Sequence, residues 1–252
     1  MGSASLFMMA LGAVFVWWNV VRSLRSRPRI AASLRLRPWR RYAGWLTVAA
    51  VAQLVLTLAT LTLHEQLAEW RFLPKLPTGP DLVPPQFLKH ALGPIAMLLA
   101  VALITPLVEE FGCRGRMQHR LERAFGIVPG VLIPAVIFSL LHGVLVAPHH
   151  LVFALFAGWV VWRTGSIWTA VYVHALNNAS VLVLLYPRRN WAIGSEDVPS
   201  WLWPYAIAAG IIAFCGLLAA GWRINRIADG RRAGARSRRR PLQRDLTPAL
   251  RG

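Results

Sequence analysis

Two glutamates and two histidines of this chain follow or lie within apolar stretches, where ionisable side chains are costly. Glu109 and Glu110 are adjacent and follow the uncharged run 91–108, while His142 and His174 each lie inside an apolar segment. Leaving any one of them unpaired in hydrocarbon costs on the order of a few kcal/mol, so we expect them to face one another inside a helical bundle. Two carboxylates with two imidazoles could activate water, with a carboxylate as general base and the imidazoles as donors to an oxyanion.

The spacing of neighbouring polar residues supports this interpretation. Glu110 and Arg114 are four residues apart, so on a helix their side chains can meet and the guanidinium can hold the carboxylate. His174 and Asn178 have the same spacing and lie one above the other on one helix face. Each of these helices therefore offers a polar face to the bundle.

At these residues the chain resembles the CPBP family (CAAX protease and bacteriocin-processing, also called ABI) of intramembrane endopeptidases. Three motifs occur in the family's order, E-E-x-x-x-R, F-x-x-x-H and H-x-x-x-N, and they are carried here by Glu109-Glu110-Phe111-Gly112-Cys113-Arg114, Phe138-Ser139-Leu140-Leu141-His142 and His174-Ala175-Leu176-Asn177-Asn178. The resemblance covers roughly 91–187. It implies hydrolysis of a peptide bond in a membrane-associated protein or peptide.

The resemblance also implies roles for the motif residues. Glu109 would activate water, and His142, His174 and Asn178 would bind or polarise the scissile carbonyl. Glu110 and Arg114 would support Glu109, and Phe138 would support the site by packing. The same four candidate residues, Glu109, His142, His174 and Asn178, also suit a catalytic zinc or another divalent metal. The sequence does not choose between a metal and a metal-free, glutamate-activated water.

Two other classes of function remain open. The constellation could be kept for helix packing or partner binding in a non-enzymatic scaffold or immunity-type membrane protein. A proton-coupled transporter is a weaker alternative, because buried carboxylates and histidines also relay protons.

The composition is that of a multi-span membrane protein. Of 252 residues, 56% are hydrophobic and only 15% are charged, and the mean hydropathy is +0.48. We predict an all-α transmembrane bundle of about seven spans, with six to eight possible. The predicted spans are 4–21, 42–63, 91–108, 127–148, 149–162, 165–187 and 200–222.

The net charge of +18 is interpreted as an orientation signal. Arginines cluster in 22–41, in 113–126 and after residue 222, and seven spans place all three stretches on one side. The prediction is an outside N-terminus, a cytoplasmic C-terminus and contact with anionic lipid headgroups rather than nucleic acid. The expected location is the cell membrane, and the excess of Arg over Lys is typical of GC-rich bacterial genomes.

The chain is divided into four parts on this interpretation. Residues 1–90 hold two helices with an Arg-rich cytoplasmic loop and an outer loop, and 91–187 form the catalytic membrane core. Residues 188–222 form an outer loop and the last span, and 223–252 are expected to be a disordered Arg-rich tail.

The position of the site between the two membrane surfaces is predicted from the neighbouring arginines. The arginines of 113–126 place Glu109 towards the cytoplasmic side, which requires the third helix to continue past Arg114. The doublet His149-His150 is expected in a short outer loop, apart from the site, because adjacent residues cannot present both rings on one helix face.

Overall fold

The computed structural model describes residues 35–74, 95, 98–144, 147–185 and 200–246, and within these residues the protein is all-helical. The predicted first span, 4–21, and the outer loop 188–199 lie outside the described residues. Leu36 and Ser166 form an isolated β-bridge. The all-α prediction is confirmed.

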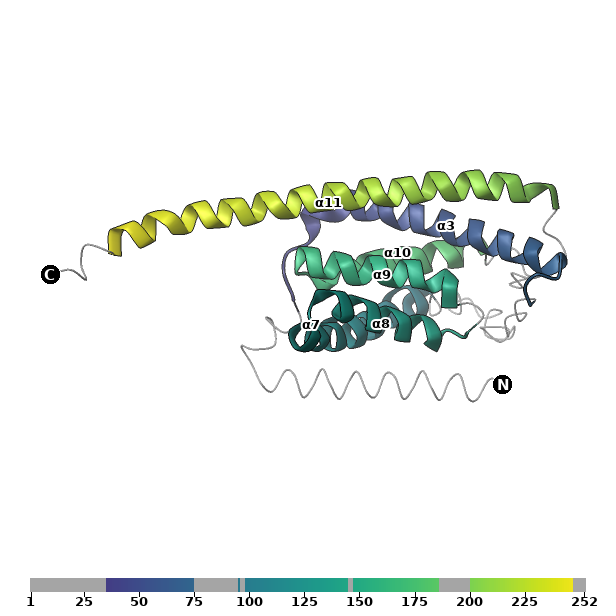
Figure 1. Cartoon of the computed structure of the whole chain (residues 1–252), viewed down its shortest axis with the longest axis horizontal. Coiled ribbons are helices and arrows are strands. Elements are labelled where there is room, and N and C mark those ends of the chain that lie inside the picture. The colour runs from purple at the N-terminus through teal and green to yellow at the C-terminus, as the bar shows by residue number, and fades with distance from the viewer. Residues whose placement is uncertain (1–34, 75–94, 96–97, 145–146, 186–199, 247–252) are drawn as a thin grey trace.

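In the described part of the chain, six helices form the bundle and its long outer pair (Figure 1). α3 (Ala43–Glu69) follows the short 3-10 helix η1 (Arg40–Tyr42), and α8 (Ile127–Leu141), α9 (Ala147–Thr164) and α10 (Ile167–Leu185) form the centre. α11 (Trp203–Leu246) follows the 3-10 helix η4 (Ser200–Leu202). A sixth, composite helix runs without a break from Ala100 to Phe125 as η2 (Ala100–Ile104), α6 (Thr105–Glu110), η3 (Phe111–Gln118) and α7 (His119–Phe125).

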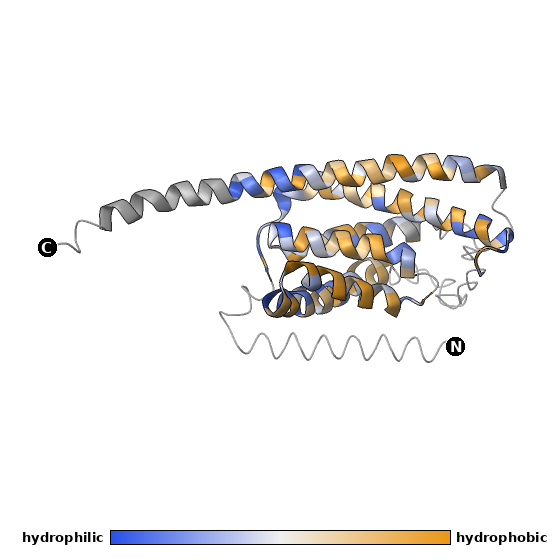
Figure 2. Ribbon diagram, in the orientation of Figure 1, coloured by the Kyte–Doolittle hydropathy of each residue, from blue (hydrophilic) through white to orange (hydrophobic). Residues whose placement is uncertain are grey.

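Among the described residues, two helices are long and apolar enough to cross a membrane. They are Arg40–Glu69 and Trp203–Arg231. Large apolar side chains are exposed on the bundle, including Leu141 at 76% and Ile212 at 72%, and hydrophobic residues occur along much of the helical ribbon (Figure 2). Such a surface fits lipid rather than water. The count of seven spans and the orientation of the termini stay predictions.

Small residues let α3 and α11 pack closely along their length (Figure 1). A Cβ atom on Gly216 would lie 3.6 Å from the Cβ of Ala52, and one on Gly210 would lie 3.4 Å from the Cβ of Ala59. Close packing of small residues is the usual way in which helices associate in lipid, where the hydrophobic effect does not hold them together.

α11 continues well past the expected end of its span. The helix extends to Leu246 and reaches beyond the bundle (Figure 1), so the expected disordered tail is helical as far as this residue. The physical reason is that arginine, which supplies nine of the residues 223–246, is a good helix former. The prediction from hydrophobicity alone, which ended the last helix at residue 222, therefore made this helix too short.

At one end of the bundle, polar contacts join the composite helix, α9, α10 and the segment that precedes η1. Arg35 forms an ion pair with Glu122 of α7, and Gln118 donates from Nε2 to the carbonyl of Gly158 in α9 at 2.8 Å. The backbone N–H of Ile167 donates to the carbonyl of Arg35 at 3.1 Å. These contacts hold the composite helix against α9 and α10.

The crossing of α7 and α8 depends on a glycine. A Cβ at Gly130 would lie 2.4 Å from Cγ and 2.8 Å from Cα of Glu122. Because backbone cannot yield cheaply, Gly130→Ala should lower stability by about 1–3 kcal/mol, measured as thermal unfolding in detergent by tryptophan fluorescence. Gly44→Ala is the matched control, since nothing lies within 4 Å of a Cβ there. Equal melting of the two variants would show that this contact does not limit packing.

Candidate functional site

A cavity of about 180 Å³ lies where five helical segments converge. Its volume is enough for several water molecules. The lining residues come from α3, α6, α8 with the residue that follows it, α9 and α10, and they are Thr57, Thr105, Glu109, Phe138, His142, His149, His150, Phe153, His174, Asn177 and Asn178. All four of the sequence-predicted catalytic candidates therefore line one cavity.

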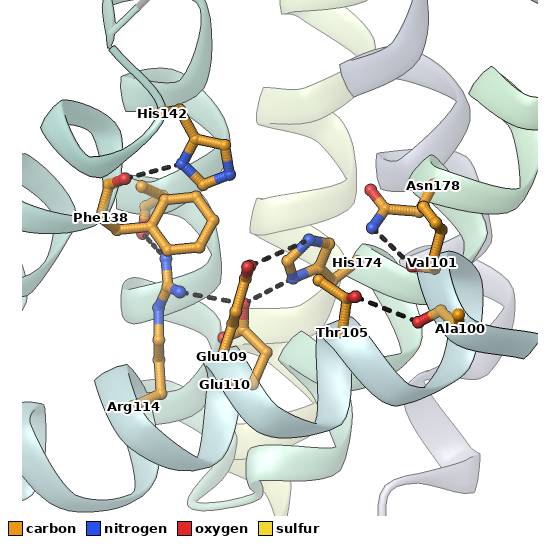
Figure 3. Close-up of polar contacts among 11 residues, drawn as sticks. Ala100, Val101, Thr105, Glu109, Glu110, Arg114, Phe138, His142, His174 and Asn178 are labelled. Atoms are coloured by element: carbon orange, nitrogen blue, oxygen red, sulfur yellow. Dashed lines mark hydrogen bonds and ion pairs between the residues drawn. The ribbon is translucent and has the colours of Figure 1, made fainter. Parts of the chain in front are cut away.

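The helix that carries both glutamates is wound as a π-helix on either side of them. A π-helix pairs a backbone carbonyl with the N–H five residues ahead, and in η2 the N–H of Thr105 donates in this way to the carbonyl of Ala100. The next carbonyl, that of Val101, would pair with Pro106, which has no N–H to give. The side-chain amide of Asn178 supplies the missing donor, from Nδ2 to the oxygen of Val101 at 2.9 Å (Figure 3). Asn178 thus connects α10 to the helix of the glutamates.

Glu110 and Arg114 form the predicted ion pair in the bundle interior. Nη1 of Arg114 lies 2.9 Å from Oε1 of Glu110, and the two side chains are 1% and 0% exposed. Nη2 donates to the carbonyl of Ala154 at 3.2 Å, and the guanidinium carbon lies 4.6 Å from the ring centre of Phe138. These extra partners offset part of the cost of removing both charges from water.

His174 lies between the two carboxylates (Figure 3). Its Nδ1 is 2.9 Å from Oε1 of Glu110, so this nitrogen donates and Nε2 faces the other glutamate. Nε2 lies 3.8 Å from Oε2 of Glu109, too far for a direct hydrogen bond. Oε2 of Glu109 is buried without a hydrogen-bond partner among the described residues, although the side chain as a whole is 31% exposed.

His142 caps the C-terminal end of α8 rather than lying inside a span. The helix ends at Leu141, and Gly143 follows with a φ of 108°, a conformation that favours glycine. The predicted span 127–148 is therefore too long. Nδ1 of His142 donates to the carbonyl of Phe138 at 2.8 Å, which leaves Nε2 for the cavity (Figure 3).

The cavity lies away from the arginine-rich end of the bundle. α8 starts beside α7, where Arg35 meets Glu122, and its 15 residues carry His142 roughly 22 Å from that end. Thr57, another lining residue, stands near the middle of α3. The long third helix is confirmed, but the helix runs from the arginine-rich end to Glu109 near mid-bundle, so the site is deeper than expected.

Five polar lining residues were not among the sequence candidates, namely Thr57, Thr105, His149, His150 and Asn177. His149 and His150 begin α9 rather than forming an outer loop, and both line the cavity. Their rings point to different neighbours: His150 stacks on His142 with ring centres 4.3 Å apart, and His149 meets Thr60 of α3. Asn177 also lines the cavity. The signal available in the sequence was a histidine doublet at the start of an apolar run.

The described residues do not gather the ligands of a metal ion. No group of three or more His, Cys, Asp or Glu side chains among them is placed to hold one. Asn178 donates from its amide nitrogen to a backbone carbonyl, so Oδ1 is the atom of this residue that would be left to hold a metal ion. The chemistry proposed for the site uses the protein's own groups.

One family model matches the chain. It describes the type II CAAX prenyl endopeptidases, Rce1-like, and covers residues 91–180. This segment contains every motif residue from Glu109 to Asn178 and also the doublet His149-His150. No curated protein and no solved structure matches the chain.

Proposed function

We infer from the match over residues 91–180 that this chain belongs to the Rce1-like CAAX prenyl endopeptidases of the CPBP family. On that premise we propose that it is an intramembrane endopeptidase that uses a glutamate-activated water. The family implies a protein or peptide substrate, and we place the chain in the cell membrane. The observation that carries the mechanism is the buried Oε2 of Glu109, which has no hydrogen-bond partner in the part of the chain that the structure describes and lies 3.8 Å from Nε2 of His174.

Glu109 serves as the general base. Helix packing does not require an acid whose buried oxygen makes no hydrogen bond to the described residues, since leaving such a group unsatisfied costs about 1–3 kcal/mol. A water held between Oε2 and the substrate would satisfy it. Glu109 takes a proton from this water while the water oxygen bonds to the carbonyl carbon, and the carbonyl electrons move to its oxygen.

His174, His142 and Asn178 stabilise the resulting oxyanion. Glu109, Glu110 and Arg114 together carry one net negative formal charge, so a protonated His174 would make the buried cluster neutral. In that form it donates from Nδ1 to Glu110 and from Nε2 to the oxyanion. Asn178 uses the amide hydrogen that Val101 does not take. His142 already donates from Nδ1 to the carbonyl of Phe138, so it donates from Nε2 when its ring carries both protons.

The intermediate then collapses by breaking the carbon–nitrogen bond. The proton held by Glu109 passes to the leaving amine, so that water and an amide have become a carboxylic acid and an amine. Glu110 and Arg114 act as positioning residues, because they fix the ring of His174 through Nδ1 without reaching the substrate.

A defined peptide tests this function directly. The probe is an internally quenched peptide with an S-farnesyl cysteine followed by three residues, presented to purified protein in liposomes. Wild-type protein should cleave it and Glu109→Ala should not, although the variant expresses. Cleavage at the same rate by both proteins would remove Glu109 from the mechanism.

His150 should act as a positioning residue for His142. Aromatic pairs contribute about 0.5–1.5 kcal/mol beyond burial, so His150→Ala should lower kcat on the same probe roughly three- to tenfold. His150→Phe keeps the stacking surface and should retain most of the activity. A His150→Phe variant as impaired as His150→Ala would assign the imidazole itself a chemical task and refute the stacking role.

A further inference from the structure

His149 has hydrogen bonds that determine which of its nitrogens carries the proton. The hydroxyl of Thr60 donates to the carbonyl of Thr57 at 2.9 Å, and Oγ1 of the same residue lies 3.1 Å from Nδ1 of His149. A hydroxyl has one hydrogen, so Thr60 accepts and His149 donates. In the neutral ring Nε2 is then an acceptor.

That acceptor is buried and has no hydrogen-bond partner among the described residues. Nε2 of His149 makes no hydrogen bond there, while the residue lines the same cavity as Glu109. The neighbours of the ring are a hydroxyl and the imidazole of His64, with ring centres 5.4 Å apart. Neither is negatively charged, so burial favours the neutral ring.

A peptide bound for hydrolysis in this cavity would bring a hydrogen-bond donor to Nε2 of His149. A peptide offers both carbonyl oxygens, which the oxyanion donors take, and backbone N–H groups, which need acceptors. Glu109 is occupied by the attacking water. Resting on the proposed function, we propose that Nε2 of His149 is a substrate-binding site that accepts a hydrogen bond from a backbone N–H of the bound peptide.

The site is built partly outside the segment that the family model matches. Thr57 and Thr60 belong to α3, whereas His149 belongs to α9, and only α9 lies within residues 91–180. α3 therefore contributes to substrate binding by fixing the tautomer of a residue across the cavity.

Two substitutions separate binding from anchoring. In His149→Asn the amide nitrogen takes the place of Nδ1, which keeps the bond to Thr60 and removes the acceptor. In His149→Gln the amide oxygen takes the place of Nε2, which keeps the acceptor and removes the bond to Thr60. A purely structural role predicts damage in the Gln variant, and a substrate-binding role predicts damage in the Asn variant.

The test measures binding without cleavage. Both substitutions are made in Glu109→Gln protein in nanodiscs, and the Kd of the S-farnesyl peptide is measured by fluorescence anisotropy. We expect His149→Asn to weaken binding roughly five- to tenfold and His149→Gln to bind within about twofold of its parent. Unchanged binding by His149→Asn would overturn the proposal, whereas failure of the proposed function would appear separately as an inactive wild-type protein.

N-methylated peptides identify the hydrogen that is bound. Peptides methylated at one backbone nitrogen at a time should include one that binds the parent roughly five- to tenfold more weakly. The same methyl group should leave the affinity of His149→Asn unchanged, because the contact is already missing. Equal losses in both proteins at every position would show that His149 does not accept a peptide N–H.

Discussion

Glu109→Gln is expected to slow peptide cleavage by about a thousandfold, because an amide cannot take a proton from water and a general base contributes about 10²–10⁴ in rate. Its melting temperature should stay close to that of the wild type. Glutamine has the same shape, and Oε2 has no hydrogen bond to lose among the described residues. The two measurements are the initial cleavage rate in liposomes and thermal unfolding in detergent.

Glu69→Gln is the matched control for this substitution. Glu69 ends α3 and accepts a hydrogen bond from Gln66, away from the cavity. It should lose a charge with no effect on the rate. A melting temperature of Glu109→Gln far below that of the wild type would instead indicate that Glu109 stabilises the packing of the helices, as the non-enzymatic alternative requires.

Arg114→Met should destabilise the protein by about 3–5 kcal/mol, because it leaves the fully buried carboxylate of Glu110 without its cation. Arg114→Lys should recover only part of the loss. A lysine keeps the charge but cannot reach both Glu110 and the carbonyl of Ala154 with one planar group. Unfolding in a denaturing detergent series would measure both changes.

The double variant Glu110→Gln/Arg114→Met completes the argument. Removing both charges should restore much of the stability, because a neutral pair carries no uncompensated charge. Activity should stay low, since Nδ1 of His174 would then face an amide instead of a carboxylate. Stability as poor as that of Arg114→Met alone would mean that the guanidinium acts mainly through packing on Phe138.

Helical spacing and the cost of buried charge predicted the centre of the site. The four-residue separation of Glu110 and Arg114 gave the ion pair, and the confinement of ionisable groups to the bundle interior brought Glu109, His142 and His174 to one cavity. These features follow from short-range geometry and from desolvation, and both can be deduced from the order of residues.

Features that depend on neighbouring helices were missed. Pro106 could have suggested a freed carbonyl, but only the position of α10 shows that Asn178 takes it. Gly143 ends α8 early, and this places His142 against His150. The doublet His149-His150 was not expected in the site because adjacent residues on a helix point to different sides. In the bundle those sides are two walls of the same cavity.

The substrate-independent comparison of membrane proteomes tests the central claim most directly. Membranes from cells that produce the wild-type chain and from cells that produce Glu109→Gln are labelled at new peptide termini and compared by mass spectrometry. We predict termini in membrane-associated proteins that require Glu109 and that fall at a shared position in their substrates. Identical sets of termini in the two membranes would contradict an endopeptidase with Glu109 as its base.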